Sequence, residues 1–170
     1  MANSILDLPL ISRIRRNHGL EHATMHILGE THPNTSFAGN ASPFGFIIFG
    51  NVTSEEVADA AVEALKKLRT GHKELATHPN CGTNYTVPGL AVGLAAWLGT
   101  LGTGKKLREK AERLPLVIML ATVALVLTRS LGPAFQKKIT TSGDPGRLEL
   151  DRVETSVRLG MRMHRVVTKG

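Results

Sequence analysis

The chain has 170 residues, of which 42 % are hydrophobic and 4 % aromatic, and its formal net charge is +7. This length fits one domain, or a small domain joined to a membrane segment. So few aromatic residues argue against a platform for stacking nucleobases. The positive charge suits either anionic lipid headgroups or nucleic acid. We favour lipid because the basic residues flank apolar segments and form no long run. We therefore expect a lipid bilayer as partner and no nucleic acid.

Nothing in the sequence indicates an oxidising compartment. The single cysteine, Cys81, excludes an intrachain disulfide. The first ten residues contain Asp7 and Pro9 and lack a long apolar core, so we do not expect a secretory signal. Both features favour a cytoplasmic position for the soluble part of the chain.

The first expected element is a helix. Apolar residues at helical spacing predict it over residues 12–29, and Gly29 is its expected end. Gly19 lowers the helix propensity by about 1 kcal/mol relative to alanine, which suggests that another backbone or a metal ligand approaches closely there. Residues 31–43 are rich in Asn, Ser and Gly, and are expected to form a loop that could hold a short strand near Phe37.

A strand and a second helix are expected next. The short apolar run 44–50 is bounded by glycine and rich in strand-forming residues, which predicts a buried strand. Thr53 and Glu56 have the spacing of a capping box, which starts a helix over residues 54–69. The polar stretch 72–85 then predicts a structured loop.

Two uncharged runs, 86–103 and 114–128, are separated by a charged connector over 104–113. Each run is near the lower end of the length that spans a bilayer, so the pattern predicts a membrane hairpin. A buried hairpin of a soluble protein is the alternative. Gly89 and Gly93 would let the two helices approach closely. Basic residues occur on both sides of the runs, so the positive-inside rule does not settle the orientation.

The C-terminal part is expected to form strands. The Gly-Pro pair at 132–133 should break the preceding helix, and residues 140–147 have the composition of a turn-rich linker. Strands are then predicted over 148–153 and 157–167, where apolar residues alternate weakly.

These elements predict an α+β membrane protein with three parts. Residues 1–85 would form a metal-site domain, residues 86–131 a transmembrane hairpin, and residues 132–170 C-terminal strands that pack on the soluble domain. The fold would then be a small soluble helix/strand domain on a two-helix transmembrane hairpin.

The densest group of reactive side chains is the H-x-x-E-H motif of His18, Glu21 and His22. Two histidines four residues apart lie on one face of a helix and can share a zinc ion, with Glu21 as a candidate general base. The same order of residues marks inverted zinc metallopeptidases. Otherwise the histidines would be ordinary surface or core residues, with Glu21 paired to a neighbour such as Arg16. His26 extends the histidine face by one turn, as a ligand, a partner of a ligand or a surface imidazole.

The second group lies in the loop before the apolar runs. His78 and Cys81 flank Pro79 in a stretch that Gly82 allows to turn, which would suit a third, or a third and fourth, metal ligand. A loop with a buried thiol and a surface imidazole is the alternative, because free cysteine is commonly a small buried hydrophobe.

Taken together, the H-G-x-E-H helix and the downstream H-P-x-C-G-T loop resemble the YqhQ family of membrane proteins. They are also similar to a smaller uncharacterised bacterial domain family. The resemblance covers about residues 17–30 and 76–100. It implies a metal site and a membrane location, with the site residues His18, Glu21, His22, His78 and Cys81, and it leaves the substrate open.

We therefore expect a membrane-bound, zinc-dependent hydrolase, in which a peptidase is the leading hypothesis. Zn²⁺, or another divalent transition metal, would be held by His18, His22, His78 and Cys81, and Glu21 would handle the proton. A full shell of four protein ligands would instead make the site structural. The alternative is accordingly a non-catalytic membrane subunit or assembly factor, and a third is a metal-free lipid-surface protein. We expect a multi-pass protein of the cell inner membrane, with other membrane proteins as substrate or complex.

Overall fold

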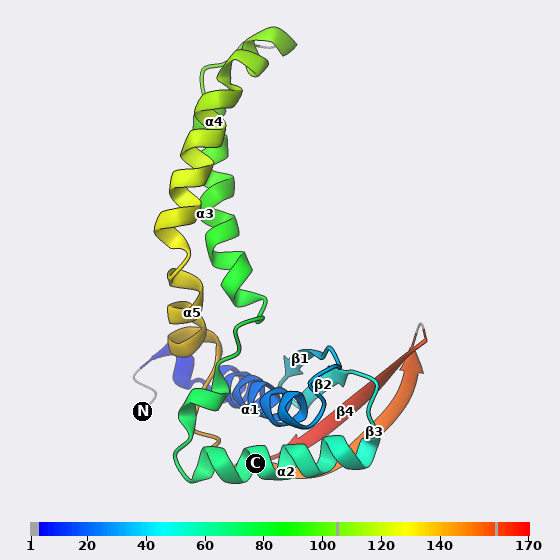
Figure 1. Cartoon of the computed structure of the whole chain (residues 1–170). Coiled ribbons are helices and arrows are strands. Elements are labelled where there is room, and N and C mark those ends of the chain that lie inside the picture. The colour runs from blue at the N-terminus through cyan, green and yellow to red at the C-terminus, as the bar shows by residue number, and fades with distance from the viewer. Residues whose placement is uncertain (1–3, 105, 159) are drawn as a thin grey trace. The chain divides into compact units, whose positions relative to one another are not determined.

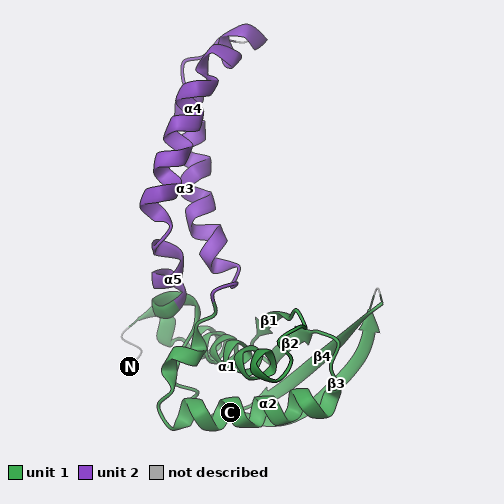
Figure 2. Ribbon diagram, viewed as in Figure 1, with its two compact units in different colours: residues 1–78, 137–170 green, residues 79–136 purple. Residues whose placement is uncertain are grey.

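A computed structural model describes residues 4–104, 106–158 and 160–170. They form two compact units: the first contains residues 1–78 and 137–170, and the second contains residues 79–136 (Figure 2). The first unit combines helices with a four-stranded antiparallel sheet, and the described part of the second is helical. The chain is therefore a mixed α+β protein, as its sequence predicts.

The first unit opens with the 3₁₀ turn η1 (Ile5–Asp7) and the helix α1 (Pro9–Thr31) (Figure 1). Helix α1 begins before the expected residue 12 because Pro9 occupies its first turn, where the missing N–H costs nothing. It also continues past Gly29, since the backbone N–H of His32 and the hydroxyl of Thr31 satisfy carbonyls of the last turn. The predicted end of this helix at Gly29 is therefore wrong.

Helix α2 (Ser54–Arg69) starts where the sequence places it. The Thr53 hydroxyl accepts a hydrogen bond from the Glu56 N–H at 3.2 Å, and the Glu56 carboxylate accepts one from the Thr53 N–H at 2.7 Å. This reciprocal pair confirms the predicted capping box. The short helix η2 (Lys73–Ala76) follows and leads into the loop that carries His78.

The sheet has the strand order β1-β2-β4-β3, with every neighbouring pair antiparallel. Strand β1 (Ala38–Ser42) follows Phe37, near which the sequence predicts a short strand within the loop, and joins β2 (Gly45–Phe49) through a tight turn. Ile48 of β2 faces His164 of β4 across the sheet. Strands β1 and β3 are therefore the two edges.

The C-terminal strands differ in extent from the prediction. Strand β3 (Glu149–Arg158) is continuous through the expected break after residue 153, with a register shift between Leu150 and Arg152. The turn before β4 (Met161–Lys169) contains Gly160 at φ +77°, a conformation that favours glycine.

One face of the sheet packs against both helices. Helix α1 contacts β1 and β2, and α2 contacts β3 and β4. Their shared core contains Leu20, Val57, Phe46, Ile48 and Val166, each at most 1 % exposed. Because strand residues alternate between faces, these positions bury one side of the sheet and fix α1 above it.

The described part of the second unit contains α3 (Thr83–Thr100), α4 (Leu107–Thr128) and α5 (Leu131–Phe135), and the π-helical turn Gln136–Thr140 leads back to the first unit. Helices α3 and α4 lie side by side (Figure 1). Their close approach is at Gly99, where a Cβ atom would lie 3.0 Å from Val117 Cγ2. Gly89 and Gly93 face open space, so the predicted role of that pair is wrong.

Among the described residues, one helix, α4, is long and apolar enough to cross a membrane, and none of its apolar stretch is buried. The sequence predicts two such helices. Helix α3 falls short because its first turn, residues 83–86, is polar and leaves too few apolar residues.

The Gly-Pro pair at 132–133 does not end a helix. Both residues lie inside α5, where Pro133 falls in the first turn and therefore removes no helical hydrogen bond. Gly132 also allows close approach, because a Cβ atom there would lie 2.7 Å from Asn84 Cα.

Candidate metal centre

The face of α1 that carries the H-x-x-E-H motif is covered by other segments. His18, His22 and His26 follow one another at four-residue spacing, which places them along one side of the helix. The ring centroids of His18 and His22 are 4.4 Å apart. His22 is 1 % exposed and Glu21 is 2 % exposed, whereas His18 is half-buried, so the motif does not lie on a solvated surface.

Backbone carbonyls orient the two motif histidines. His18 Nδ1 lies 3.0 Å from the Thr140 carbonyl oxygen, and His22 Nδ1 lies 2.9 Å from that of Ala76. Because a carbonyl only accepts, each Nδ1 donates this hydrogen bond, and in the neutral ring the lone pair is then on Nε2. Metal-binding histidines are typically held in this way, through a hydrogen bond from the other ring nitrogen.

Gly19 makes this arrangement possible. A Cβ atom at residue 19 would overlap the Ser142 carbonyl oxygen and would lie 3.1 Å from Ala76 Cβ. The absence of a side chain lets both segments approach α1, which brings the carbonyls of Ala76 and Thr140 to the histidines. The close approach expected from the sequence is confirmed, and the neighbour is backbone.

A further group joins the two imidazoles. One ligand atom from each of His18, His22 and Cys81 can be chosen so that all lie within 4.8 Å of one another. Ligands of a tetrahedral zinc ion are about 3.5 Å apart, so separations of at most 4.8 Å are of the order that a shared ion needs. The His18–His22–Cys81 group could therefore hold a metal ion.

His78 lies outside this group of three. Its ring centroid is 5.8 Å from that of His22 and 4.9 Å from that of His26. Burial, together with the neighbouring rings of His26 and His22, lowers the pKa of His78 from 6.5 to about 4. The side chain is therefore neutral at pH 7, and its role as a ligand stays a prediction.

Glu21 points from α1 toward the sheet. A Cβ atom on Gly39 of β1 would overlap its carboxylate. The neighbouring Asn17 faces the same way, donating to the Ser42 carbonyl at 2.8 Å and accepting from the Thr168 hydroxyl at 2.9 Å. Glu21 thus lies between the histidine face and strand β1. The sequence did not single out Gly39, although a glycine inside a strand is a signal of close approach.

Comparison with known proteins shows the family. Residues 13–153 match the domain of unknown function DUF6391. The chain belongs to the DUF6391 family. An uncharacterized protein of Picosynechococcus sp. (strain PCC 7002) is 32 % identical over 155 residues, an alignment that covers 83 % of this chain and 71 % of the relative. No solved structure is detectably similar to the chain.

The DUF6391 match includes all five predicted site residues. Membership of a family of unknown function agrees with the predicted similarity to an uncharacterised domain family. Neither the matching family nor the matching protein is described as YqhQ, so the resemblance of this chain to the YqhQ family stays a prediction.

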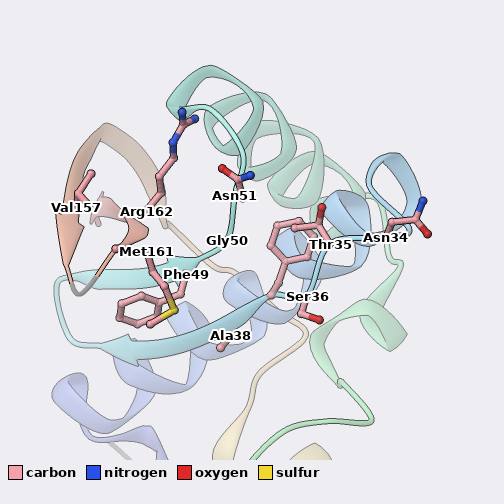
Figure 3. Close-up of a pocket in the computed structure, with 12 residues that line it drawn as sticks. Asn34, Thr35, Ser36, Ala38, Phe49, Gly50, Asn51, Val157, Met161 and Arg162 are labelled. Atoms are coloured by element: carbon pink, nitrogen blue, oxygen red, sulfur yellow. The ribbon is translucent and has the colours of Figure 1, made fainter.

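A separate pocket of about 780 Å³ opens in the first unit of this DUF6391 protein, beside the start of β1 (Figure 3). Its apolar lining includes Phe37, Phe49, Val157 and Met161. The polar lining comes from the residues before β1 and after β2 and from Arg162, which also donates to the Val52 carbonyl at 3.2 Å. Such a mixture of apolar and polar side chains is typical of ligand pockets.

Proposed function

We propose that this protein is a membrane-bound, metal-dependent hydrolase that cleaves peptide bonds. The observation that carries the proposal is the meeting of three ligand atoms, from His18, His22 and Cys81, within 4.8 Å. Catalytic zinc sites keep three protein ligands and leave a position for water or substrate, whereas structural sites use four. A three-ligand shell, with a buried carboxylate on the same helix, suits hydrolysis.

The donor set favours zinc or another borderline transition metal. Imidazole and thiolate are poor ligands for magnesium and calcium, which prefer oxygen. A divalent ion in this shell would polarise a substrate carbonyl and lower the pKa of a bound water. The thiolate of Cys81 would reduce this effect by adding negative charge to the ion. Cysteine nevertheless occurs among the ligands of catalytic zinc.

Glu21 is proposed as the general base and acid of the reaction. Its carboxylate would accept the proton of the attacking water and return it to the amine that leaves when the peptide bond breaks. The carbonyls of Thr140 and Ala76 would keep the imidazoles in the binding tautomer throughout.

We propose that α4 crosses the bilayer and that α3, whose apolar part is shorter, packs beside it as the second arm of a hairpin. Leu94 and Trp97 on α3 and Ile118 and Val126 on α4 are each more than half exposed, as expected for side chains that face lipid. Basic residues flank the apolar part of α4 and could meet headgroups. The protein would then be a multi-pass protein of the inner membrane, with its first unit in the cytoplasm and other membrane proteins as substrate or complex.

A structural metal site is the second candidate function. His78 favours it, because its neutral imidazole lies beside the ring of His22 and could complete a four-ligand shell. In that case the protein would be a non-catalytic membrane subunit or assembly factor. The number of protein ligands on the ion distinguishes the two functions.

Metal analysis of the full chain in detergent tests both. Wild-type protein should bind about one ion per chain, and His18→Ala should lose it. His72→Ala is the control, since His72 is exposed and bonded to Glu74. The cobalt form should show a thiolate band that Cys81→Ser removes. Glu21→Gln should retain this spectrum and abolish hydrolysis of a peptide pool. Metal-free wild-type protein would contradict both functions.

A further inference from the structure

Strand β1 is an open edge of the sheet. It pairs with β2, and no other described strand pairs with it. In an antiparallel pair, the N–H and C=O groups of alternate residues point away from the partner strand. Ala38, Gly39 and Asn40 are exposed, so the free edge can reach another chain.

The two edges of the sheet are protected differently. The edge strand β3 carries many charged side chains, which is a common way to prevent pairing with other chains: Glu149, Asp151, Arg152, Glu154 and Arg158. Strand β1 has the sequence Ala-Gly-Asn-Ala-Ser. It contains no charge, proline or bulky side chain, so nothing in its composition blocks the addition of a strand.

Strand β1 lies against one residue of the motif helix. The carboxylate of Glu21 occupies the space next to Gly39, in the middle of β1. At the start of the same strand, Ala38 lines the pocket that contains Phe37, Phe49 and Met161 (Figure 3). A chain lying along β1 would therefore pair with the strand that covers Glu21 and reach a pocket large enough for a bulky side chain.

We propose that β1 binds an extended polypeptide segment, which adds to the sheet as a fifth strand and places a large apolar side chain in the pocket. The inference rests on the proposed function, for which it names the substrate: an unfolded or extended protein segment. Backbone hydrogen bonds supply affinity in this mode of recognition, and a side-chain pocket supplies selectivity.

Two proline variants test the edge. Consecutive strand residues direct their N–H groups to opposite sides of the strand. One of the variants Asn40→Pro and Ala41→Pro therefore removes a hydrogen bond to β2. The other removes only an N–H donor that points away from β2. The melting temperature identifies which is which, because the loss of a bond to β2 destabilises the sheet. The probe is a pool of short random peptides that carry the photoreactive residue benzoylphenylalanine.

Binding is measured without catalysis. The full chain in detergent, with His18→Ala to remove the metal site, is irradiated with the pool, and crosslinks are mapped by mass spectrometry. Crosslinks should concentrate on residues 35–42 and on Met161, from peptides enriched in large apolar residues. The outward-facing proline variant should lose about tenfold in yield, as expected for the loss of about 1.4 kcal/mol of binding. Its melting temperature should be nearly unchanged.

The outcome separates this inference from the proposed function. Crosslinks on β1 in a protein that hydrolyses nothing would support the binding surface alone. Crosslinks elsewhere, or equal yields from both proline variants, would overturn the inference and leave the metal measurements intact. Pairing of β1 only with a second copy of the chain would also overturn it.

Discussion

The main chain of Ser142 occupies the space in which a side chain on Gly19 would begin. This relationship fixes the distance between α1 and the segments that supply the carbonyl partners of His18 and His22. We therefore expect Gly19→Ala to destabilise the first unit by about 1–3 kcal/mol, as for other overpacked interiors. It should also weaken metal binding by about 10- to 100-fold, because the histidines lose their orienting partners.

Chemical denaturation and metal titration would measure both effects. Gly29→Ala on the same helix is the matched control, since a Cβ atom there meets nothing. It should be neutral, or stabilising by up to about 1 kcal/mol through helix propensity. Similar losses in the two variants would show that the close approach has no special importance.

A second prediction concerns Gly39 and Glu21. Gly39→Ala should displace the Glu21 carboxylate while leaving the metal ligands unchanged. We expect peptide hydrolysis to fall by at least about tenfold, in line with the usual contribution of a general acid or base, at unchanged metal content. Glu21→Asp combined with Gly39→Ala should be more stable than Gly39→Ala alone, because the shorter side chain leaves room for the new methyl group.

Urea midpoints and metal content would test this prediction. A Gly39→Ala protein with full activity would show that the position of the carboxylate does not matter. Equal stability of the single and double variants would place the strain elsewhere.

The pH dependence of stability follows from His78. Its pKa is about 4 in the folded chain, lowered chiefly by burial from 6.5. The neutral ring is therefore favoured by folding, and its contribution is fully present above pH 6.5. It is lost as the pH falls from 6.5 toward 4, by up to about 3 kcal/mol.

Unfolding of metal-free protein at pH 7 and pH 5 would measure this loss. His78→Gln should reduce the difference between the two pH values, and His72→Gln, at an exposed position, should not. Some dependence should remain in His78→Gln, because burial also lowers the pKa of His164. An unchanged difference in His78→Gln would contradict the assignment.

The apolar surface of α4 leads to a fourth prediction. Met119 is 55 % exposed near the middle of the apolar part. Met119→Lys should cost about 2.5–3.5 kcal/mol of insertion free energy if lipid surrounds this helix. The variant should therefore move from the membrane fraction to the soluble or aggregated fraction after carbonate extraction. Val62→Lys, which alters an exposed apolar residue of α2, should behave as wild type.

The sequence predicts elements whose signals are local. Thr53 and Glu56 define the start of α2 by themselves, since the capping box joins residues three apart. Strand β1 has a weaker signal: the sequence indicates a short strand only near Phe37, because Ala-Gly-Asn-Ala-Ser itself has low strand propensity. Its extended conformation depends on pairing with β2, a contact that a local pattern does not reveal.

The same distinction applies to the candidate site. Helical spacing places His18 and His22 together, and their contact is observed. Their partners are the carbonyls of Thr140 and Ala76. Any residue type can supply a backbone carbonyl, so the sequence does not identify these partners. The sequence could indicate only Gly19, because a residue without a side chain inside a helix is a signal that another segment approaches closely.

The strand order has a consequence for biosynthesis. Strand β4 lies between β2 and β3, and its Thr168 bonds to Asn17 of α1, yet it follows α3 and α4 in the chain. A ribosome therefore releases the apolar helices before the sheet that packs against α1 can be completed. If α4 enters a bilayer and the His18–His22–Cys81 group binds an ion, as proposed, the helix would meet the membrane before β4 is made, and the ion would bind after that.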